Sequence, residues 1–142
     1  MILLDTNVVS EPLKASNDKG VLSWLDEQAI ETLYLSTITL AELRFGIAVL
    51  PAGKRRDTLF ASLEQQVLPL FVGRILPFDE QASQAYATLR ARTRTAGQAI
   101  ATVDGYIAAI AVAQGFAVAT RDTSPFEAVG LKVINPWAWM AH

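Results

Sequence analysis

Short apolar segments with strand character alternate along this chain with segments of helical periodicity. Buried strands are expected at five places, residues 2–4, 33–38, 74–78, 116–119 and 131–134. Helices are expected at residues 21–29, 40–50, 58–68, 80–95 and 99–114. This alternation predicts an α/β fold, a three-layer sandwich whose mainly parallel central sheet is flanked by helices. A chain of 142 residues is expected to form a single domain, residues 1–142.

The composition restricts the classes of function. A net charge of −2 argues against a protein that coats nucleic acid by bulk charge. The absence of cysteine excludes disulfides, thiolate zinc sites and a cysteine nucleophile, and it agrees with a reducing cytoplasm. Neither a signal peptide nor a membrane span is expected, because the apolar runs are too short. With 51% hydrophobic residues, the chain is apolar enough to suggest that a partner covers part of its surface, although a plain globular domain can also reach this value.

Acidic residues follow two of the expected strands, at the edge where parallel α/β sheets bind their ligands. Asp5 comes directly after the strand at 2–4, and Asp122 follows the strand at 116–119 in "FAVATRD". Aspartate is also common in surface turns and at helix N-caps. These two positions alone therefore leave a structural and a functional interpretation open.

Asp104 lies on the apolar face of its expected helix. In "AIATVDGYIAAIAVA", a turn of 100° per residue places it on the side of Ile100, Ile107 and Ala111. An unpaired carboxylate is costly to ionise there, so it must be protonated, paired with a base, hydrogen-bonded or bound to a metal. Together with the acids at the strand ends, it suggests a cluster of carboxylates.

Glu42 has two competing interpretations. The segment Thr39-Leu40-Ala41-Glu42 matches a capping box, in which the glutamate only reaches back to the start of its own helix. Alternatively, Glu42 is a site acid, because it too enters a helix just after an expected strand. The local sequence does not separate the two.

Four converging carboxylates would suit Mg²⁺ or Mn²⁺, which prefer oxygen ligands. Such a metal can bind a phosphate oxygen, lower the pKa of a water molecule and stabilise a leaving oxygen, which is the chemistry of phosphodiester hydrolysis. The sequence lacks the residues that other common catalytic and nucleotide-binding sites require. The single histidine, His142, rules out a multi-histidine metal site and argues against a Ser-His-Asp triad. Gly53-Lys54 is followed by arginine rather than Ser or Thr, and no GxGxxG occurs.

Four motifs together resemble a known family. "LLDTNVVSE", "TITLAELRFGI" with Glu42, "TVDGYIAAIA" with Asp104 and "VATRDTSPFE" with Asp122 are similar, in this order, to a PIN domain. Within that superfamily the chain most resembles the VapC-type toxins of bacterial toxin–antitoxin pairs, especially the FitB-like branch. The resemblance covers essentially the whole chain.

This resemblance implies a fold, an activity and partners. It implies a parallel sheet between helices, a Mg²⁺- or Mn²⁺-dependent endoribonuclease that hydrolyses RNA, homodimers, and inhibition by a small cognate antitoxin. Asp5, Glu42, Asp104 and Asp122 would be the catalytic, metal-binding acids, with Asp122 matching the most variable acid of the family. Asn7 and Thr120 would be polar groups that orient these acids.

Two other functions stay open. One is a catalytically silent PIN module that acts only as the partner of a DNA-binding antitoxin. The other is a Mg²⁺-binding receiver domain that accepts phosphate on an aspartate, which needs a lysine past the end of a late strand. Lys132 is the only lysine in that region, and it falls within the expected strand.

Several basic and aromatic residues have a structural and a functional interpretation. Residues 54–56, Arg90 and Arg94 are interpreted as solvated helix positions that could also touch RNA, with Arg92 turned away from the other two. Arg44 and Arg121 flank the acids in sequence, so either could contact phosphate. Trp137 and Trp139 are expected to pack the end of the chain onto the core rather than stack on bases.

Overall fold

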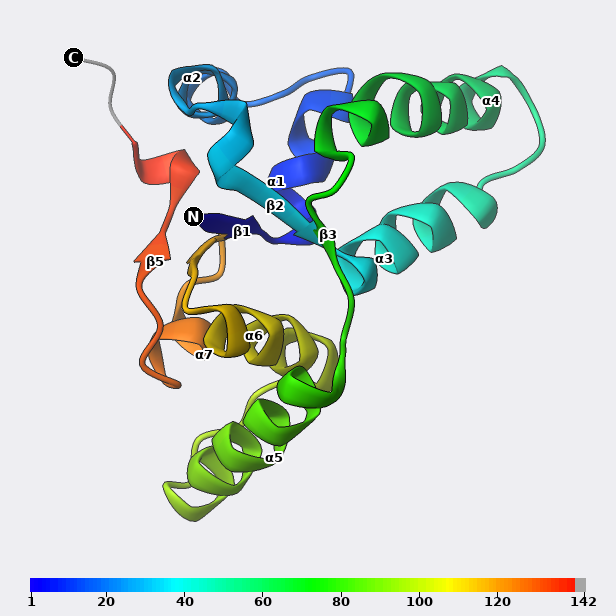
Figure 1. Ribbon diagram of the computed structural model, residues 1–142. Helices are drawn as coiled ribbons and strands as arrows, with labels where there is room; N and C mark the ends of the chain where they lie inside the picture. The colour runs from blue at the N-terminus through cyan, green and yellow to red at the C-terminus, as the bar shows by residue number, and fades with distance from the viewer. Residues whose placement is uncertain (140–142) are drawn as a thin grey trace.

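The computed structural model describes residues 1–139 and contains a five-stranded sheet in the order β3-β2-β1-β4-β5 (Figure 1). Every neighbouring pair of strands runs parallel, as predicted. The strands are β1 (Ile2–Leu4), β2 (Leu33–Ser36), β3 (Ile75–Leu76), β4 (Ala117–Ala119) and β5 (Val133–Ile134). The first strand of the chain is therefore the central strand of the sheet.

Helices cover both faces of this sheet. They are α1 (Thr6–Ser10), α2 (Lys19–Glu27), α3 (Thr37–Ala48), α4 (Lys54–Ala61), α5 (Glu80–Thr95), α6 (Thr102–Gln114) and α7 (Ser124–Glu127). Helices α1 to α4 lie on one side and α5 to α7 on the other (Figure 1). None of the described helices is long and apolar enough to cross a membrane.

Successive residues of one strand serve two different cores. In β1, Leu3 packs with α5, α6 and α7, while Leu4 packs with α1, α2 and α3. In β4, Val118 packs into the same core as Leu3, and Ala119 packs into the same core as Leu4. This division follows from the two-residue period of a strand, whose side chains point alternately to opposite faces. A strand that is buried on both faces needs a continuous run of apolar residues, as these strands have. The two cores confirm the predicted three-layer sandwich.

Four of the five predicted helices have different bounds from those expected. The helices expected at 21–29 and 40–50 span Lys19–Glu27 and Thr37–Ala48. The helix expected at 99–114 begins at Thr102, because Ala101 has an extended backbone (ψ 148°) and its carbonyl accepts the first hydrogen bond of α6, from the N–H of Gly105. Ile100 is buried in the core but belongs to the connection, not to the helix. The helix expected at 58–68 begins at Lys54 and changes to π pitch over Ser62–Val67.

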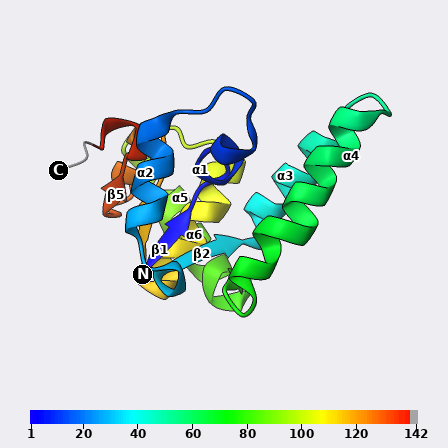
Figure 2. The ribbon, with the colours of Figure 1, turned by 90° about the horizontal axis from the view of Figure 1, so that it is seen from above.

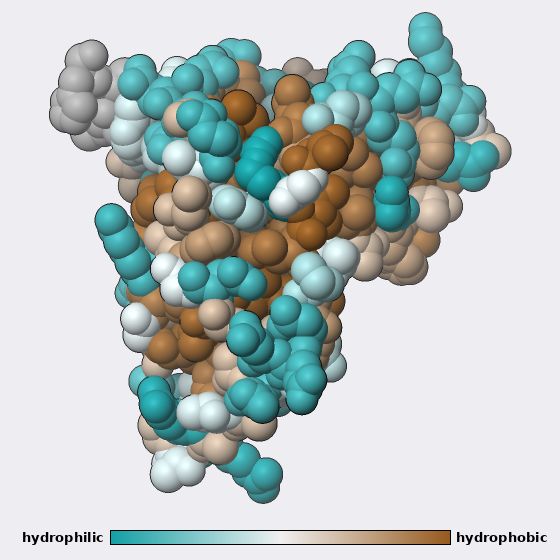
Figure 3. Space-filling model, in the orientation of Figure 1, coloured by the Kyte–Doolittle hydropathy of each residue, from teal (hydrophilic) through white to brown (hydrophobic). Residues whose placement is uncertain are grey.

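Helices α3 and α4 form an arm that projects beside the sheet (Figures 1 and 2). Arg44 of α3 and Glu64 join its two sides with paired hydrogen bonds of 2.8 and 3.1 Å. Large apolar side chains are exposed along it, with Phe45 at 69%, Val49 at 61% and Phe60 at 55% exposure. Hydrophobic surface also gathers over the middle of the molecule, towards the base of the arm (Figure 3).

Candidate active site

Asp5 follows the central strand directly, and its carboxylate is fixed from two directions. The backbone N–H of Thr6 donates to Oδ1 at 2.8 Å, so Asp5 caps helix α1. The hydroxyl of Thr120 donates to Oδ2 at 2.8 Å from the end of the neighbouring strand β4. The backbone N–H of Asp5 also donates to the carbonyl of Ala119, which continues the ladder between the strands. A carboxylate held in this way has a set orientation, and each oxygen retains a free lone pair.

Burial dominates the electrostatics of Asp5. Only 6% of the residue is exposed, and this desolvation raises the pKa of its carboxyl above the ordinary 3.8. The hydrogen bonds from Thr120 and Thr6 oppose the rise, while the negative charges of Glu42 and Asp122 add to it. The pKa of the buried Asp5 is therefore raised in part by the charges of two acids that lie far from it in the sequence.

Glu42 is not part of a capping box. Helix α3 begins at Thr37, and its N-cap is Ser36, whose hydroxyl accepts from the N–H of Thr39 at 3.0 Å. The predicted cap at Thr39 is therefore wrong by three residues, and Glu42 lies beyond the first turn of the helix. Its Oε1 accepts a short hydrogen bond from the hydroxyl of Thr6, the residue after Asp5. Glu42 thus reaches across to the end of β1 instead of back to its own helix.

Asp104 lies in the first turn of α6 and is half-buried, so its predicted place on the apolar face is only partly correct. Desolvation raises the pKa of its carboxyl to about 6, and the charges of Asp5, Asp122 and Glu42 add to the effect. Asp5 and Asp104 therefore each respond to the negative charges of other predicted acids, and neither carboxyl has its pKa lowered by a neighbouring cation.

The two predicted orienting residues differ in what they contact. Thr120 is fully buried and binds Asp5. Asn7 accepts from the backbone N–H of Arg121 at 3.4 Å, so it joins α1 to the loop after β4 rather than binding an acid directly. Asp122 follows in that loop and is exposed.

The donor chemistry of this cluster suits a hard cation, because all four groups are carboxylates. As the side chains stand in residues 1–139, however, no three or more of Asp, Glu, His or Cys are close enough together to hold a metal ion. Glu42 and Asp122 are exposed, whereas Asp5 is buried and fixed from two directions. Metal binding would therefore draw the exposed acids towards Asp5, against a repulsion that the metal charge removes.

A groove of about 910 Å³ begins beside these acids and runs between α1, α3 and α4. Thr6 and Glu42 lie at its acidic end, and Leu43, Ile47, Leu50 and Leu59 supply apolar lining. Lys54 and Arg55, from the basic run at 54–56, also line it. Residues at the start of α4 are thus placed to meet a ligand of the groove, the alternative to a solvated position that the sequence left open.

The remaining predicted contacts are mostly structural. Arg44 binds Glu64, so the phosphate contact considered for it is not supported. Arg121 stacks over Trp137 at 5.2 Å, and both Trp137 and Trp139 pack against the core, as expected. Lys132 precedes β5, at the end of the strand opposite to the acids. The single histidine, His142, lies outside the described residues.

Comparison with known proteins gives a consistent result. The sequence profile described as "PIN domain" matches residues 2–132. The chain is 64% identical over 137 residues to the VapC ribonuclease Y4jK of Sinorhizobium fredii, covering 96% of this chain and 98% of that protein. It is 53% identical to the toxin FitB of Neisseria gonorrhoeae, covering 96% and 99%.

Solved structures give the same relationship. The crystal structure of FitAcB from Neisseria gonorrhoeae superposes with a TM-score of 0.95 at 52% identity, covering 98% of this chain and 100% of that one. The structure of FitAB bound to an IR36 DNA fragment also gives 0.95, at 51% identity, covering 100% and 99%.

Proposed function

Because this chain belongs to the PIN domain family, we propose that it is a divalent-metal-dependent endoribonuclease and the toxin of a toxin–antitoxin pair. The observation that carries the proposal is the fixed carboxylate of Asp5, which Thr120 holds at the carboxyl edge of the sheet and which is coupled to three further acids. The naming of a 64% identical relative as a ribonuclease supports the RNA substrate, and such a substrate would place the protein in the cytoplasm.

Asp5, Glu42, Asp104 and Asp122 would hold the Mg²⁺ or Mn²⁺. When bound, the metal supplies a water of lowered pKa and a charge that binds a phosphate oxygen. Without it, the four carboxylates repel the phosphates of RNA, just as the neighbouring acids help to raise the pKa values of Asp5 and Asp104. Thr120 and the N–H of Thr6 keep Asp5 in one orientation, so that the exposed acids can assemble around a fixed group.

The partner we propose is a small antitoxin that covers the arm. The exposed Phe45, Val49 and Phe60 and the groove beside α3 and α4 support this assignment. Relatives of known structure are described as FitAcB and as FitAB bound to DNA. We also propose that the chain forms homodimers, as the family resemblance implies.

One observation favours the catalytically silent module as a second candidate: the acids do not stand at metal-binding distance in residues 1–139. The receiver domain is disfavoured, because Lys132 lies at the wrong end of β5 for a lysine that contacts a phosphorylated aspartate.

RNA cleavage in Mg²⁺ or Mn²⁺, with an EDTA control, tests the proposal. Asp5→Asn is the decisive variant, because asparagine caps a helix as well as aspartate does and keeps α1 intact. Asp26→Asn, in the exposed part of α2, is the matched control. We expect cleavage by the wild type and Asp26→Asn in metal only, and none by Asp5→Asn. A wild type that binds its antitoxin but leaves RNA intact would establish the silent module instead.

A further inference from the structure

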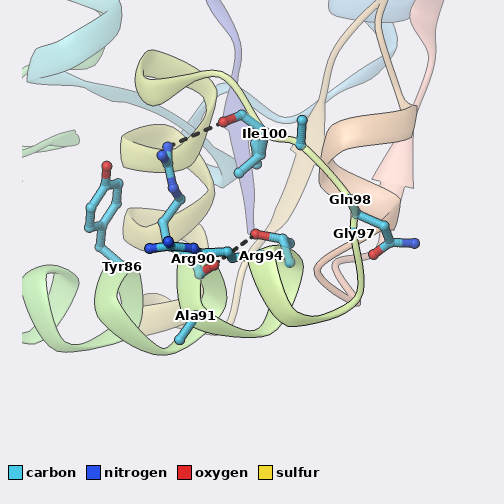
Figure 4. A pocket seen from close by; sticks show the side chains of 9 residues that line it. Tyr86, Arg90, Ala91, Arg94, Gly97, Gln98 and Ile100 are labelled. Carbon is cyan, nitrogen blue, oxygen red and sulfur yellow. Dashed lines mark hydrogen bonds between the residues drawn. The ribbon is translucent and has the colours of Figure 1, made fainter.

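A basic pocket lies between the C-terminal half of α5 and the connection that leads into α6. It has a volume of about 610 Å³, and Figure 4 shows the residues that line it. Two arginines, Arg90 and Arg94, are four residues apart on α5 and so lie on the same face of the helix. Within the described part of the chain, neither forms a salt bridge, although the protein has a net negative charge.

Arg90 is held in place by its neighbours rather than extended into solvent. Its side chain is half-buried, its guanidinium carbon lies 5.4 Å from the centre of the Tyr86 ring, and its Nη1 donates to the carbonyl of Ile100 at 3.2 Å (Figure 4). The expectation of a solvated side chain is therefore wrong for Arg90, whereas Arg94 is exposed as expected. That bond is the one side-chain hydrogen bond of Arg90 to the rest of residues 1–139, which leaves further N–H groups for a ligand.

The pocket adjoins the acidic site through Gly105. A Cβ atom built on Gly105 would lie 3.5 Å from Nη1 and 3.5 Å from Cδ of Arg90, and 3.1 Å from the Tyr86 ring. A larger residue there would force these side chains away, so the glycine lets the guanidinium lie against the start of α6. Gly105 directly follows Asp104, so the pocket and the proposed catalytic acids meet at the start of α6.

We infer that this pocket is a subsite for the backbone of the RNA substrate, where Arg90 and Arg94 bind a phosphate next to the one that is cleaved. The inference rests on the proposed ribonuclease function. The acidic site cannot attract a polyanion by itself, so an adjacent cationic group is needed to bring the strand in. Arginine suits the task because its planar fork binds two phosphate oxygens at once. Phosphate contacts of this kind position the strand without reading its sequence.

Binding of a fluorescein-labelled single-stranded RNA to the Asp5→Asn protein in Mg²⁺, followed by fluorescence anisotropy, tests the inference apart from cleavage. In this background we compare Arg94→Gln and Arg90→Gln with Arg92→Gln, an equal loss of charge on the same helix but outside the pocket. We expect Arg94→Gln and Arg90→Gln each to weaken binding about tenfold and to lower the salt dependence by about one counterion. Arg92→Gln should bind like its parent.

Equal weakening by Arg92→Gln and Arg94→Gln would reduce the effect to overall charge and overturn the subsite, as would unchanged binding by Arg94→Gln. Because Arg94 is exposed, its replacement does not threaten the fold, even if Arg90→Gln proves unstable. A wild type that does not cleave RNA, combined with weakened binding by Arg94→Gln, would overturn the ribonuclease and leave the RNA subsite standing. The two proposals therefore fail separately.

Discussion

The hydroxyl of Thr120 donates a 2.8 Å hydrogen bond to the carboxylate of Asp5 across a separation of 115 residues in the sequence. Both residues are buried, and each directly follows one of two paired strands, β1 and β4. The bond therefore joins the ends of neighbouring strands at the edge where the acids gather. It is also the strongest reason to regard Asp5 as a positioned group and not only as a helix cap.

Thr120→Val should destabilise the protein, because the variant keeps the shape of the side chain but removes the donor to a buried carboxylate. We expect a loss of about 1–3 kcal/mol in the free energy of unfolding, measured by urea denaturation at pH 7.5. Thr120→Ser retains the hydroxyl and is the control, with a smaller loss. Equal stability of wild type and Thr120→Val would show that the bond contributes nothing.

Without metal, the stability of the wild type should fall as pH rises between about 4 and 6. The folded-state pKa values of Asp5 and Asp104 are raised, so in this range the folded protein binds more protons than the unfolded chain. The stabilisation is present below the ordinary pKa of 3.8 and is lost as pH passes through the raised values, about 6 for Asp104. Melting temperatures in EDTA across this range measure the effect. Asp104→Asn should flatten the curve, and an unchanged curve would mean that Asp104 does not titrate there.

Mg²⁺ should stabilise the wild type, by ~2.7 kcal/mol at a concentration one hundred times the dissociation constant. Asp104→Asn should melt at or above the wild-type temperature in EDTA at pH 7.5, because it removes a repelled charge, and should lose most of the gain in Mg²⁺. If Asp104 were only a satisfied buried acceptor, its replacement would destabilise the protein with or without metal. Thermal melting of both proteins in both buffers decides between these outcomes.

Glu42→Gln should leave the fold intact, within about 0.5 kcal/mol, because Glu42 does not cap α3. As a proposed ligand, it should nevertheless lower cleavage on the order of 100-fold. Denaturation and RNA cleavage on one preparation separate the two effects, with Glu31→Gln as an exposed control outside the site. Full activity of Glu42→Gln would remove this residue from the metal site.

The isolated chain should run as a dimer or larger by light scattering, and should become more soluble with its antitoxin. The exposed Phe45 and Phe60 supply the physical reason, since a folded protein rarely leaves such side chains in water without a partner. A monomer that stays soluble at high concentration, with or without the antitoxin, would contradict both proposed interfaces.

Periodicity predicted the elements of this fold well because each element is buried in a regular way. The helix at 80–95 has the predicted bounds, and the strand at 2–4 coincides with β1. Helices α1 and α7, with five and four residues, were missed because they are too short to show a repeat. That residues 1–142 form a single domain stays a prediction.

Caps and contacts between distant residues were harder to predict. The pattern Thr39 to Glu42 satisfies a capping box in sequence, but the strand expected at 33–38 ends at Ser36, which pairs with Leu76 of β3 and then caps the helix. Whether Arg44 meets Glu64, or Arg90 meets Ile100, depends on how helices pack, and no local pattern encodes that. The four acids were recognised because strand ends and motif order carry their positions. Their catalytic roles stay predictions.

The central place of β1 has a consequence for how the protein is made. Residues 2–4 are synthesised long before their partner strand β4, which lies at residues 117–119. Until that late segment emerges, Asp5 has neither Thr120 nor the loop with Asp122 beside it. The nascent chain therefore carries an incomplete set of acids until residues 117–122 have emerged, and a ribosome that synthesises this protein is not exposed to the assembled site before that point.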